Sequence, residues 1–590
     1  MKKINTIIIL LFLSIIGFSQ TEITSKEVQN HIDFLASDDL KGRFPGTEGD
    51  ETAANYIRDE FKNLGLELLF DDGFQYFDIQ TKSKVVGSKS LQIGSFSCKY
   101  VEEYQPLMFS ASGKFSGKAV FAGYGMTIED ENQPWNDYEN LDVKGKWVVI
   151  FRGKPNIAAY PETYFDKYTI EYSKVLTASD LGAVGVVFIN GYNDYPKDKL
   201  IEPCFGRFSE KAQIPAYSVI RYTGDRLLGF AGKKVGEVEK LINETGKTVS
   251  FDLDVTIKND LTIEPVMVKT HNVVAVLEGS DENLKDEYIV IGAHYDHLGF
   301  GGCNSGSKMP DKIAIHNGAD DNASGVAGVL EIAEYLAANK NLLGRSIIFI
   351  AFGAEERGLL GSNYFVENLP VDKDKIYCML NMDMIGKYNG KLTVMGAGTA
   401  AEFNDVFNSV DYDTTTLNVK LHDKPYSGSD HASFISHGIP AVFFYGSSGK
   451  DYHTPFDDAE FINSESAAII MQYVANSAIK FSIKEGNLTF VDVKDENNNN
   501  NHGYGMRVKL GVVPAFEDTD NKGMKISGVT DDSPAQKGGM QANDIITAIN
   551  DEPVSNIYDY MERLKKINPG DKTVIKINRG GEEIEIEIQF

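Results

Sequence analysis

The chain has few cysteines, a deficit of positive charge and no long apolar segment beyond its amino terminus. Its 590 residues include four cysteines, 58 lysines and arginines, and 85 aspartates and glutamates, for a formal net charge of −27. The cysteines are too few and too dispersed for a disulfide framework, although one bridge is possible. No C-x-x-C pair is present, which excludes a cysteine-built zinc site. A surface this acidic repels nucleic acid and anionic lipid, so we expect no nucleic-acid partner.

The first twenty residues have the pattern of a secretory signal peptide. Two lysines precede an apolar run at residues 7–18, which is too short for a membrane span, and small residues near Gln20 suit cleavage. An uncleaved membrane anchor is the alternative. No later segment reaches membrane-spanning length. We therefore expect an exported protein, periplasmic or secreted, with no membrane span after signal cleavage.

The texture of the sequence changes along the chain, which indicates several domains. Residues 24–70 have apolar residues at helical spacing, and short β-rich segments follow from about 110 to 260. From 270 onwards strands and helices alternate, which is typical of an α/β sheet domain. Its expected strands are residues 272–277, 288–293, 346–351, 376–382 and 441–445, and its clearest helix begins after Asp321.

A polar, asparagine-rich run at residues 495–501 has the composition of a linker. The residues behind it, about 504–590, form a compact unit with expected strands and a helix at 557–567. The β-rich stretch before 260 interrupts the α/β pattern. We therefore expect it to be a unit inserted into a larger domain.

Two histidines and three carboxylates lie in short, distinctive settings, which are G-A-H-Y-D-H, G-A-D-D-N-A-S-G, A-E-E, N-M-D-M and Y-H-T-P. In an open α/β sheet, ligands gather at the carboxyl ends of the strands. Three of the settings follow expected strands, and one lies at the amino end of the clearest helix. The five residues are His294, Asp321, Glu356, Asp383 and His453.

This set of side chains suits a pair of divalent metal ions. Imidazole and carboxylate are ligands for Zn²⁺, and three carboxylates can offset two dications if one of them bridges. Two such metals, about 3.5–4 Å apart, share a hydroxide and polarise a carbonyl. Of the adjacent Glu355 and Glu356, one can bind metal while the other takes the proton of the water. Asp296 could accept a hydrogen bond from the second imidazole nitrogen of His294. The pattern predicts a hydrolase.

The five settings, in this order, resemble those of the co-catalytic dizinc aminopeptidase family, whose relatives include glutamate carboxypeptidase II and the transferrin receptor. The resemblance implies an α/β fold, with a zinc-exopeptidase-like mixed sheet flanked by helices. It also implies two Zn²⁺ per chain. His294 and Asp383 would hold one ion, and Glu356 and His453 would hold the other. Asp321 would bridge the two.

The resemblance assigns further roles around these ligands. Glu355 would be the general base, and Asp296 would support His294 from behind. Tyr426, in Y-S-G-S-D-H, would steady the oxyanion. The family often has a cis peptide after the bridging aspartate, here between Asp321 and Asn322. The remaining candidates are interpreted as loop or supporting residues rather than ligands or catalysts: His297, His316, His431, His437 and Cys303.

The insert and the tail resemble two further modules. The insert, with F-S-G-K-A-V-F-A-G-Y-G and V-K-G-K-W-V-V-I-F-R-G, resembles a protease-associated domain, which would restrict access to the cleft or be a passive insert. The tail resembles a PDZ domain through Leu510-Gly511-Val512 and D-S-P-A-Q-K-G-G-M. A PDZ domain binds a peptide terminus as an added strand, yet Pro514 in the receiving strand can donate no hydrogen bond. Two roles for the tail therefore stay open: it binds a peptide or protein partner, or it is an appendage that stabilises the fold.

We therefore expect an exported aminopeptidase that acts on peptides. A carboxypeptidase or dipeptidase on the same fold, a receptor-like binding protein and a single-zinc amide-forming cyclase are the alternatives. The expected divisions are a signal peptide at 1–20, a dizinc peptidase domain at 21–110 and 262–485, a protease-associated domain at 111–261, a linker at 486–503 and a PDZ-like domain at 504–590.

Overall fold

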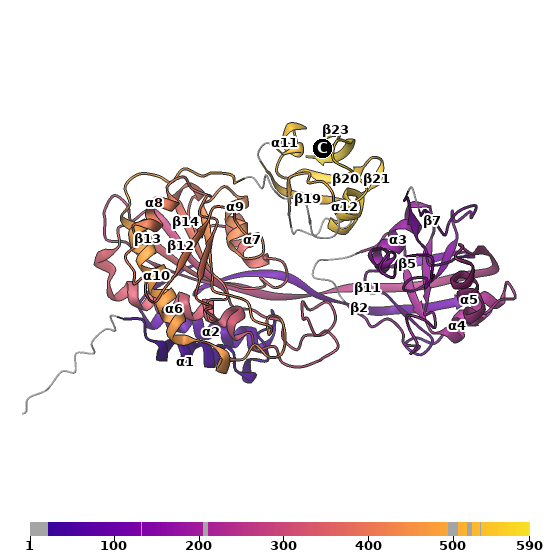
Figure 1. The fold of residues 1–590 in the computed structure, drawn as a ribbon, viewed down its shortest axis with the longest axis horizontal. Coiled ribbons are helices and arrows are strands. Elements are labelled where there is room, and N and C mark those ends of the chain that lie inside the picture. The colour runs from indigo at the N-terminus through magenta and orange to yellow at the C-terminus, as the bar shows by residue number, and fades with distance from the viewer. Residues whose placement is uncertain (1–21, 131–132, 205–210, 494–505, 516–521, 531–532) are drawn as a thin grey trace, which may run out of the picture.

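The computed structural model describes residues 22–130, 133–204, 211–493, 506–515, 522–530 and 533–590 (Figure 1). The expected signal peptide and the asparagine-rich run lie outside these residues. Among the described helices, none combines the length and the apolar character that a membrane crossing requires. The described chain forms two large lobes and a smaller third unit (Figure 1).

A mixed sheet forms the centre of the first lobe. Four of its strands are parallel and run side by side. Every strand that the sequence predicts in this lobe is confirmed to within one residue, except that the strand predicted at 272–277 begins much earlier, at Ser250. Their side chains are almost all buried, as expected for parallel strands covered on both faces. The parallel strands are β12 (Tyr288–His294), β13 (Ser346–Phe352), β14 (Ile376–Met382) and β17 (Ala441–Tyr445), and β15 (Leu392–Met395) and β16 (Val419–His422) extend one edge.

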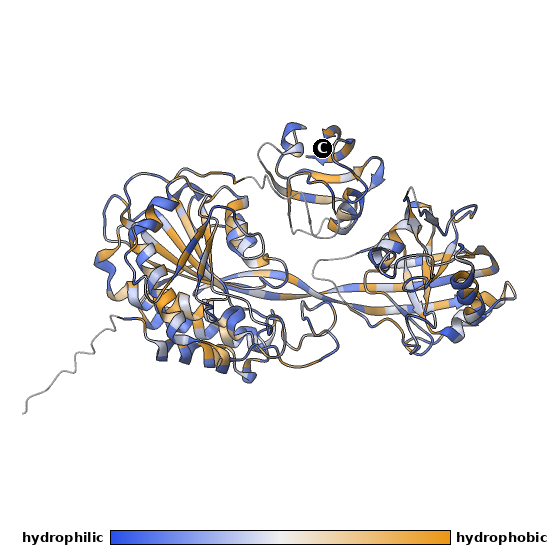
Figure 2. Ribbon diagram, viewed as in Figure 1, coloured by the Kyte–Doolittle hydropathy of each residue, from blue (hydrophilic) through white to orange (hydrophobic). Residues whose placement is uncertain are grey.

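Helices cover both faces of this sheet. Successive strand residues point to opposite faces, and since both sets are apolar, both faces have to be buried. Ile289 and Ile291 pack in one cluster, and Val290 packs in the other. The larger cluster includes residues of α1 (Ser25–Leu35), α2 (Glu48–Asn63), α6 (Ser324–Ala338), α8 (Phe403–Asn408) and α10 (Ser464–Ile483), and the smaller one those of α7 (Leu360–Glu367) and α9 (His431–Ser436). Figure 2 shows the apolar residues gathered in the strands of this lobe.

Two long strands connect the first lobe to the second (Figure 1). β2 (Phe74–Ile93) and β11 (Ser250–Leu277) pair antiparallel over most of their length. The carboxyl end of β11 pairs with β13, and its amino end pairs with β5 (Gly113–Ala122) in the second lobe. One sheet therefore runs continuously through both lobes. The sequence did not predict these lengths, because the middle of the ribbon is covered on neither face and has no apolar alternation.

The second lobe has a layer of strands with helices beside it. The strands predicted from the β-rich texture are confirmed as β5, β8 (Trp147–Phe151), β9 (Gly185–Ile189) and β10 (Ala216–Val219), which are parallel neighbours in that order. Its other elements include β4 (Tyr104–Pro106), β6 (Thr127–Ile128), β7 (Trp135–Asn136), α3 (Glu171–Asp180), α4 (Arg221–Gly229) and α5 (Val235–Thr245). A disulfide joins Cys204 of this lobe to Cys303 in the loop after β12, with the two Cα atoms 5.8 Å apart. The sequence allowed one bridge without naming its partners.

The third unit has its own apolar core. Its terminal strand alternates glutamate with isoleucine, and Ile586 and Ile588 of that strand are buried. Pro514 lies in a strand, as expected, and pairs with Ile526. Its described elements are β18 (Val512–Pro514), β19 (Met524–Val529), α11 (Pro534–Lys537), β20 (Ile545–Ile549), β21 (Glu552–Pro553), α12 (Ile557–Leu564), β22 (Lys572–Arg579) and β23 (Glu582–Gln589).

Candidate metal centre

The structure brings the five predicted ligands and Glu355 together at the carboxyl ends of the parallel strands. His294 ends β12, the two glutamates follow β13 and Asp383 follows β14. Asp321 lies in the turn before α6, and His453 lies in the loop after β17. All six side chains are buried. Residues separated by up to 159 positions in the chain therefore form one cluster.

Asp321 lies between the two predicted histidine ligands. Its Oδ1 is 3.3 Å from Nε2 of His294, and its Oδ2 is 3.0 Å from Nε2 of His453. Each carboxylate oxygen thus faces a different imidazole, which is the arrangement that a bridging carboxylate requires. The peptide bond between Asp321 and Asn322 is cis, as the family resemblance implied.

The other carboxylates fall on two sides of Asp321. Nε2 of His294 is 3.6 Å from Oδ2 of Asp383 and 3.9 Å from Oε2 of Glu355. On the other side, Nε2 of His453 is 3.2 Å from Oε1 of Glu356. The cluster therefore has two centres, each with one predicted histidine and at least one carboxylate of its own.

His297 lies beside the second centre. Its Nδ1 is 2.9 Å from Oε1 of Glu356, and its side chain is fully buried. The ligand atoms of His297, Asp321 and Glu356 all lie within 4.8 Å of one another, as do those of His294, Glu355 and Asp383. The sequence interpretation of His297 as a supporting residue stays a prediction, but the structure places this histidine in contact with a predicted ligand.

The electrostatics of the cluster suit divalent cations. Burial raises the pKa of Glu355 well above its ordinary value, and repulsion from the carboxylates of Glu356, Asp430 and Asp383 adds to this effect. Burial would also raise the pKa of Asp321, but hydrogen bonds from His294 and His453 outweigh it and hold that pKa well below its usual range. Several carboxylates packed away from water need positive charge beside them. Together with two imidazoles, they fit Zn²⁺ by ligand type.

Asp296 supports the turn that carries the two glutamates. Its Oδ1 accepts a hydrogen bond from the backbone N–H of Glu355 at 2.9 Å, and its Oδ2 accepts one from Glu356 at 3.3 Å. Nδ1 of His294 lies 3.2 Å from the backbone carbonyl oxygen of Asp296 and 3.8 Å from its Oδ1. Asp296 therefore contacts both His294 and the glutamates, and its carboxylate bonds more closely to the turn than to the imidazole.

Tyr426 is not part of the buried cluster. Its side chain is 53% exposed, and its ring stacks on Phe443 with 5.9 Å between ring centroids. A different tyrosine contacts a predicted ligand directly, because the ring of Tyr452 stacks on His453 at 3.9 Å. Tyr452 belongs to the Y-H-T-P setting, but nothing in that setting marked it as a stacking partner.

Three side chains that the sequence analysis missed support the predicted ligands, Asp457 and Ser429 by direct hydrogen bonds and Lys387 through Asp457. Oδ2 of Asp457 accepts from the backbone N–H groups of Asp320 and Asp321, both at 3.0 Å. Lys387 donates to Oδ1 of Asp457 at 2.8 Å. The hydroxyl of Ser429 donates to Oδ2 of Asp383 at 2.8 Å. Asp457 lies only four residues after His453, and Ser429 lies in the Y-S-G-S-D-H setting of Tyr426, which were the available signals.

Comparisons with known families identify all three parts of the chain. Residues 272–478 match the model of Peptidase family M28, residues 111–227 match that of the PA domain, and residues 491–590 match that of the PDZ domain. The PA domain lies in the second lobe and the PDZ domain includes the third unit. These matches confirm the mixed α/β fold and the two modules that the sequence resembled.

Several curated proteins are similar to parts of the chain. Aminopeptidase YwaD of Bacillus subtilis is 28% identical over 316 residues, which is 50% of this chain and 61% of that protein. A probable leucine aminopeptidase of Arthroderma otae is 27% identical over 227 residues, 36% of this chain and 58% of that protein. A glutamate carboxypeptidase 2 homolog of Caenorhabditis elegans is 22% identical over 79% of this chain and 69% of its own. The chain thus spans less than two thirds of the length of these two aminopeptidases.

Solved structures are similar as well. An aminopeptidase from Aneurinibacillus sp. strain AM-1 has a TM-score of 0.46 and 23% identity, over 80% of this chain and 97% of its own. The zinc aminopeptidase BSAP from Bacillus subtilis has a TM-score of 0.46 and 20% identity, over 78% of this chain and 95% of its own. On the family matches, the chain carries a Peptidase family M28 domain, together with a PA domain and a PDZ domain.

Proposed function

We propose that the protein is an exported zinc exopeptidase that removes amino-terminal residues from peptides. The M28 domain and the similarity to aminopeptidases support a zinc-dependent exopeptidase. The observation that carries the proposal is the position of Asp321, whose two oxygens face two different histidines inside a buried group of carboxylates. Export follows from the signal-peptide pattern of residues 1–20.

The ligands divide into two sets that share Asp321. His294 and Asp383 would hold one zinc ion, and Glu356 and His453 would hold the other, so that two Zn²⁺ are bound per chain. When bound, two such ions supply Lewis acidity for the scissile carbonyl and lower the pKa of a water molecule between them. The hydrogen bond from Ser429 orients Asp383, and second contacts of this kind fix the direction of a metal ligand.

Glu355 would act as the general base. Its carboxylate lies at the centre with His294 and Asp383, and its neighbour Glu356 is occupied by His453 and His297. In this position Glu355 can accept the proton of the attacking water and pass it to the leaving amine. Asp296 holds the Glu355 backbone, so it orients the base. Tyr426, whose side chain is 53% exposed, would steady the oxyanion when a peptide is bound.

The domain divisions follow the same reasoning and remain part of the proposal. Residues 21–110 and 262–485 would form the peptidase domain, residues 111–261 the PA domain, and residues 504–590 the PDZ domain after a linker at 486–503. Leu91 and Ile93 pack in the core of the second lobe. The β2–β11 ribbon therefore contributes to both lobes. The proposed boundaries divide the sequence, whereas the two domains share this ribbon in space.

A carboxypeptidase or dipeptidase is the second candidate, because a glutamate carboxypeptidase 2 homolog is among the relatives. One experiment separates the two. A mixed peptide is offered to the zinc-loaded protein in free, amino-acetylated and carboxyl-amidated form, and the products are read by mass spectrometry. Stepwise loss from the amino end that only acetylation blocks is the expected result. Loss from the carboxyl end that amidation blocks would establish the second candidate, and no cleavage with metal bound would contradict both.

A further inference from the structure

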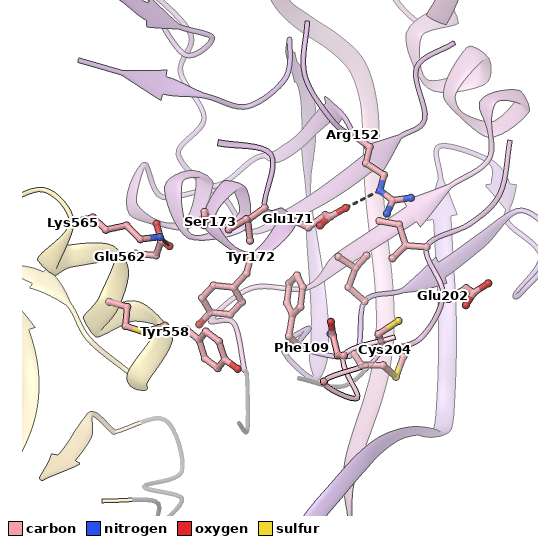
Figure 3. A pocket seen from close by; sticks show the side chains of 17 residues that line it. Phe109, Arg152, Glu171, Tyr172, Ser173, Glu202, Cys204, Tyr558, Glu562 and Lys565 are labelled. Carbon is pink, nitrogen blue, oxygen red and sulfur yellow. Dashed lines mark hydrogen bonds and ion pairs between the residues drawn. The ribbon is translucent and has the colours of Figure 1, made fainter. Parts of the chain in front are cut away.

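A cavity of about 490 Å³ lies where the three units of the chain meet (Figure 3). One wall comes from α3 and the residues before it in the second lobe, and another comes from α12 of the PDZ domain. The third wall is the disulfide-linked loop of the M28 domain, through Asn304 and Gly306. Its volume lies within the range of about 300–1,000 Å³ that is usual for ligand pockets.

Polar contacts hold α12 against α3 and so form the cavity. Nη1 and Nη2 of Arg563 each lie 2.6 Å from one oxygen of Asp180, a paired contact that fixes orientation. The hydroxyl of Tyr172 donates to Oδ1 of Asp559 at 2.8 Å, and Nδ2 of Asn556 donates to the carbonyl of Lys211 at 3.0 Å. Arg563 and Asp559 are buried. These contacts fix the position of α12 relative to α3.

The chemistry of the walls favours an apolar guest. Phe109, Tyr172 and Tyr558 supply aromatic surface, and Figure 3 shows their rings near one another. Four of the five charged lining residues pair with each other, since Nε of Arg152 is 2.7 Å from Oε1 of Glu171 and Lys565 bonds to Glu562, and Glu202 is the fifth. Paired charges at the walls leave the aromatic surface as the main attraction, which suits an aromatic or long aliphatic side chain.

The loop that closes the cavity also contacts the metal centre. Gly306 lines the cavity, and its carbonyl oxygen is 2.9 Å from Nδ1 of His453. Lys308, two residues on, donates its backbone N–H to the carbonyl of His453 at 2.8 Å. The disulfide between Cys204 and Cys303 ties the same loop to the second lobe. One short segment therefore separates the cavity from a predicted zinc ligand.

We propose that this cavity binds an aromatic or long aliphatic side chain of the peptide substrate, several residues beyond the scissile bond. The inference rests on the proposed function, because the guest is a peptide whose amino end lies at the metal centre. It assigns the PA and PDZ domains a joint role in substrate selection. The enzyme would then favour oligopeptides with an apolar residue at one preferred distance from the amino end.

The test uses octapeptides with an amino-terminal leucine and serine elsewhere, in which a single phenylalanine is moved from position three to position eight. We expect kcat/KM to rise about tenfold or more for one phenylalanine position over the all-serine peptide. Ile170→Asp should reduce this ratio to about one. Ile170 lines the cavity, is 45% exposed and is the N-cap of α3. Because aspartate is a favoured N-cap, the change adds a charge to the cavity without weakening the helix.

Leu241→Asp is the matched control. Leu241 lies on α5, is 43% exposed and is not among the cavity residues, so its variant should keep the wild-type ratio. A wild-type protein that shows no positional preference, or an Ile170→Asp variant that retains one, would overturn the inference.

Binding separates this inference from the proposed function. Amino-acetylated, fluorescent forms of all the octapeptides cannot be cleaved by an aminopeptidase, and their affinities can be measured by anisotropy to find the position at which phenylalanine binds best. Weaker binding to Ile170→Asp than to Leu241→Asp supports the cavity even if no peptide is hydrolysed, in which case the proposed function alone fails. Equal binding to both variants overturns the cavity.

Discussion

The guanidinium of Arg43 donates a hydrogen bond to the backbone carbonyl of Tyr295 at 2.7 Å, across 252 positions of the chain. The same side chain donates to the carbonyl of Gly318 at 3.0 Å. Tyr295 follows His294, and Gly318 precedes Asp321 by three positions. Arg43 therefore connects the two segments that carry predicted ligands of both centres, and it does so from a loop near the amino terminus.

Replacing Arg43 with methionine should weaken zinc binding at both centres. The change keeps a long apolar stem but removes the donor of the buried Tyr295 carbonyl, at about 1–3 kcal/mol, while the carbonyl of Gly318 keeps the N–H of Ala323. We expect zinc affinity to fall about tenfold or more, with activity restored by excess zinc. Arg43→Lys should be intermediate, because lysine cannot supply the fork of donors. Isothermal titration of the metal-free protein measures the affinity.

The control for this change is Arg58→Met on α2, where the arginine pairs with Asp59 and Asp72. That variant should bind zinc as the wild type does. Unchanged zinc affinity in Arg43→Met would show that the ligand segments keep their positions without Arg43.

Replacing Glu355 with glutamine should abolish turnover while leaving the zinc content close to two per chain. The amide cannot take a proton from water, and general-base catalysis contributes roughly 10²–10⁴-fold. Steady-state kinetics and metal analysis of the same sample give both quantities. Glu278→Gln, at a residue whose side chain is 64% exposed, is the matched control. Loss of zinc together with activity would mean that Glu355 is a ligand and that Glu356 is the better candidate for the base.

The centre of the fold and the ligand cluster could be predicted from the sequence for one physical reason. Buried parallel strands have continuous apolar runs, so the ends of β12, β13 and β14 are visible in the sequence. Once those ends are known, His294, the glutamate pair and Asp383 must meet at one edge of the sheet. The imidazole and carboxylate side chains then predict a site for divalent metal ions.

Features that depend on tertiary proximity alone could not be predicted. Arg43 acts on backbone carbonyls, which every residue has, so no pattern marks its partners. Cys204 and Cys303 are 99 positions apart, and only the packing of the second lobe against the loop pairs them. The ribbon of β2 and β11 has little apolar alternation because water covers both of its faces midway. The contact between α12 of the third unit and α3 of the second lobe could not be predicted either, because it depends on how these two units pack against each other.

Asp50 should make the stability of the fold depend on pH. Burial raises its pKa from 3.8 to about 7, although the backbone N–H of Gly46 and the hydroxyl of Thr270 donate to its Oδ2. The folded state then holds the proton more tightly than the unfolded state does. The stability from this group is therefore fully present below about pH 4 and is lost as pH rises towards 7, at up to about 1.4 kcal/mol per pH unit.

Asp50→Asn should remove this contribution, because the amide oxygen can accept the same two hydrogen bonds and carries no titrating proton. Thermal unfolding between pH 5 and 8 measures it. The Tm of the variant should fall less with rising pH than that of the wild type. Asp33→Asn, at an exposed position of α1, should follow the wild-type curve. Parallel curves for Asp50→Asn and wild type would contradict the assignment.

Replacing Asp321 with alanine should remove both zinc ions together. Each of its oxygens faces one histidine, and hydrogen bonds from those histidines offset the cost of burying its charge. Without this carboxylate neither centre keeps its full ligand set, so we expect zinc to fall from two per chain to near zero in mass-spectrometric metal analysis. Asp383→Ala is the comparison, because it removes a ligand from one centre only and should leave about one zinc per chain. An Asp321→Ala protein that keeps one tightly bound zinc would show that the two centres bind metal independently, and Asp321 would then belong to only one of them.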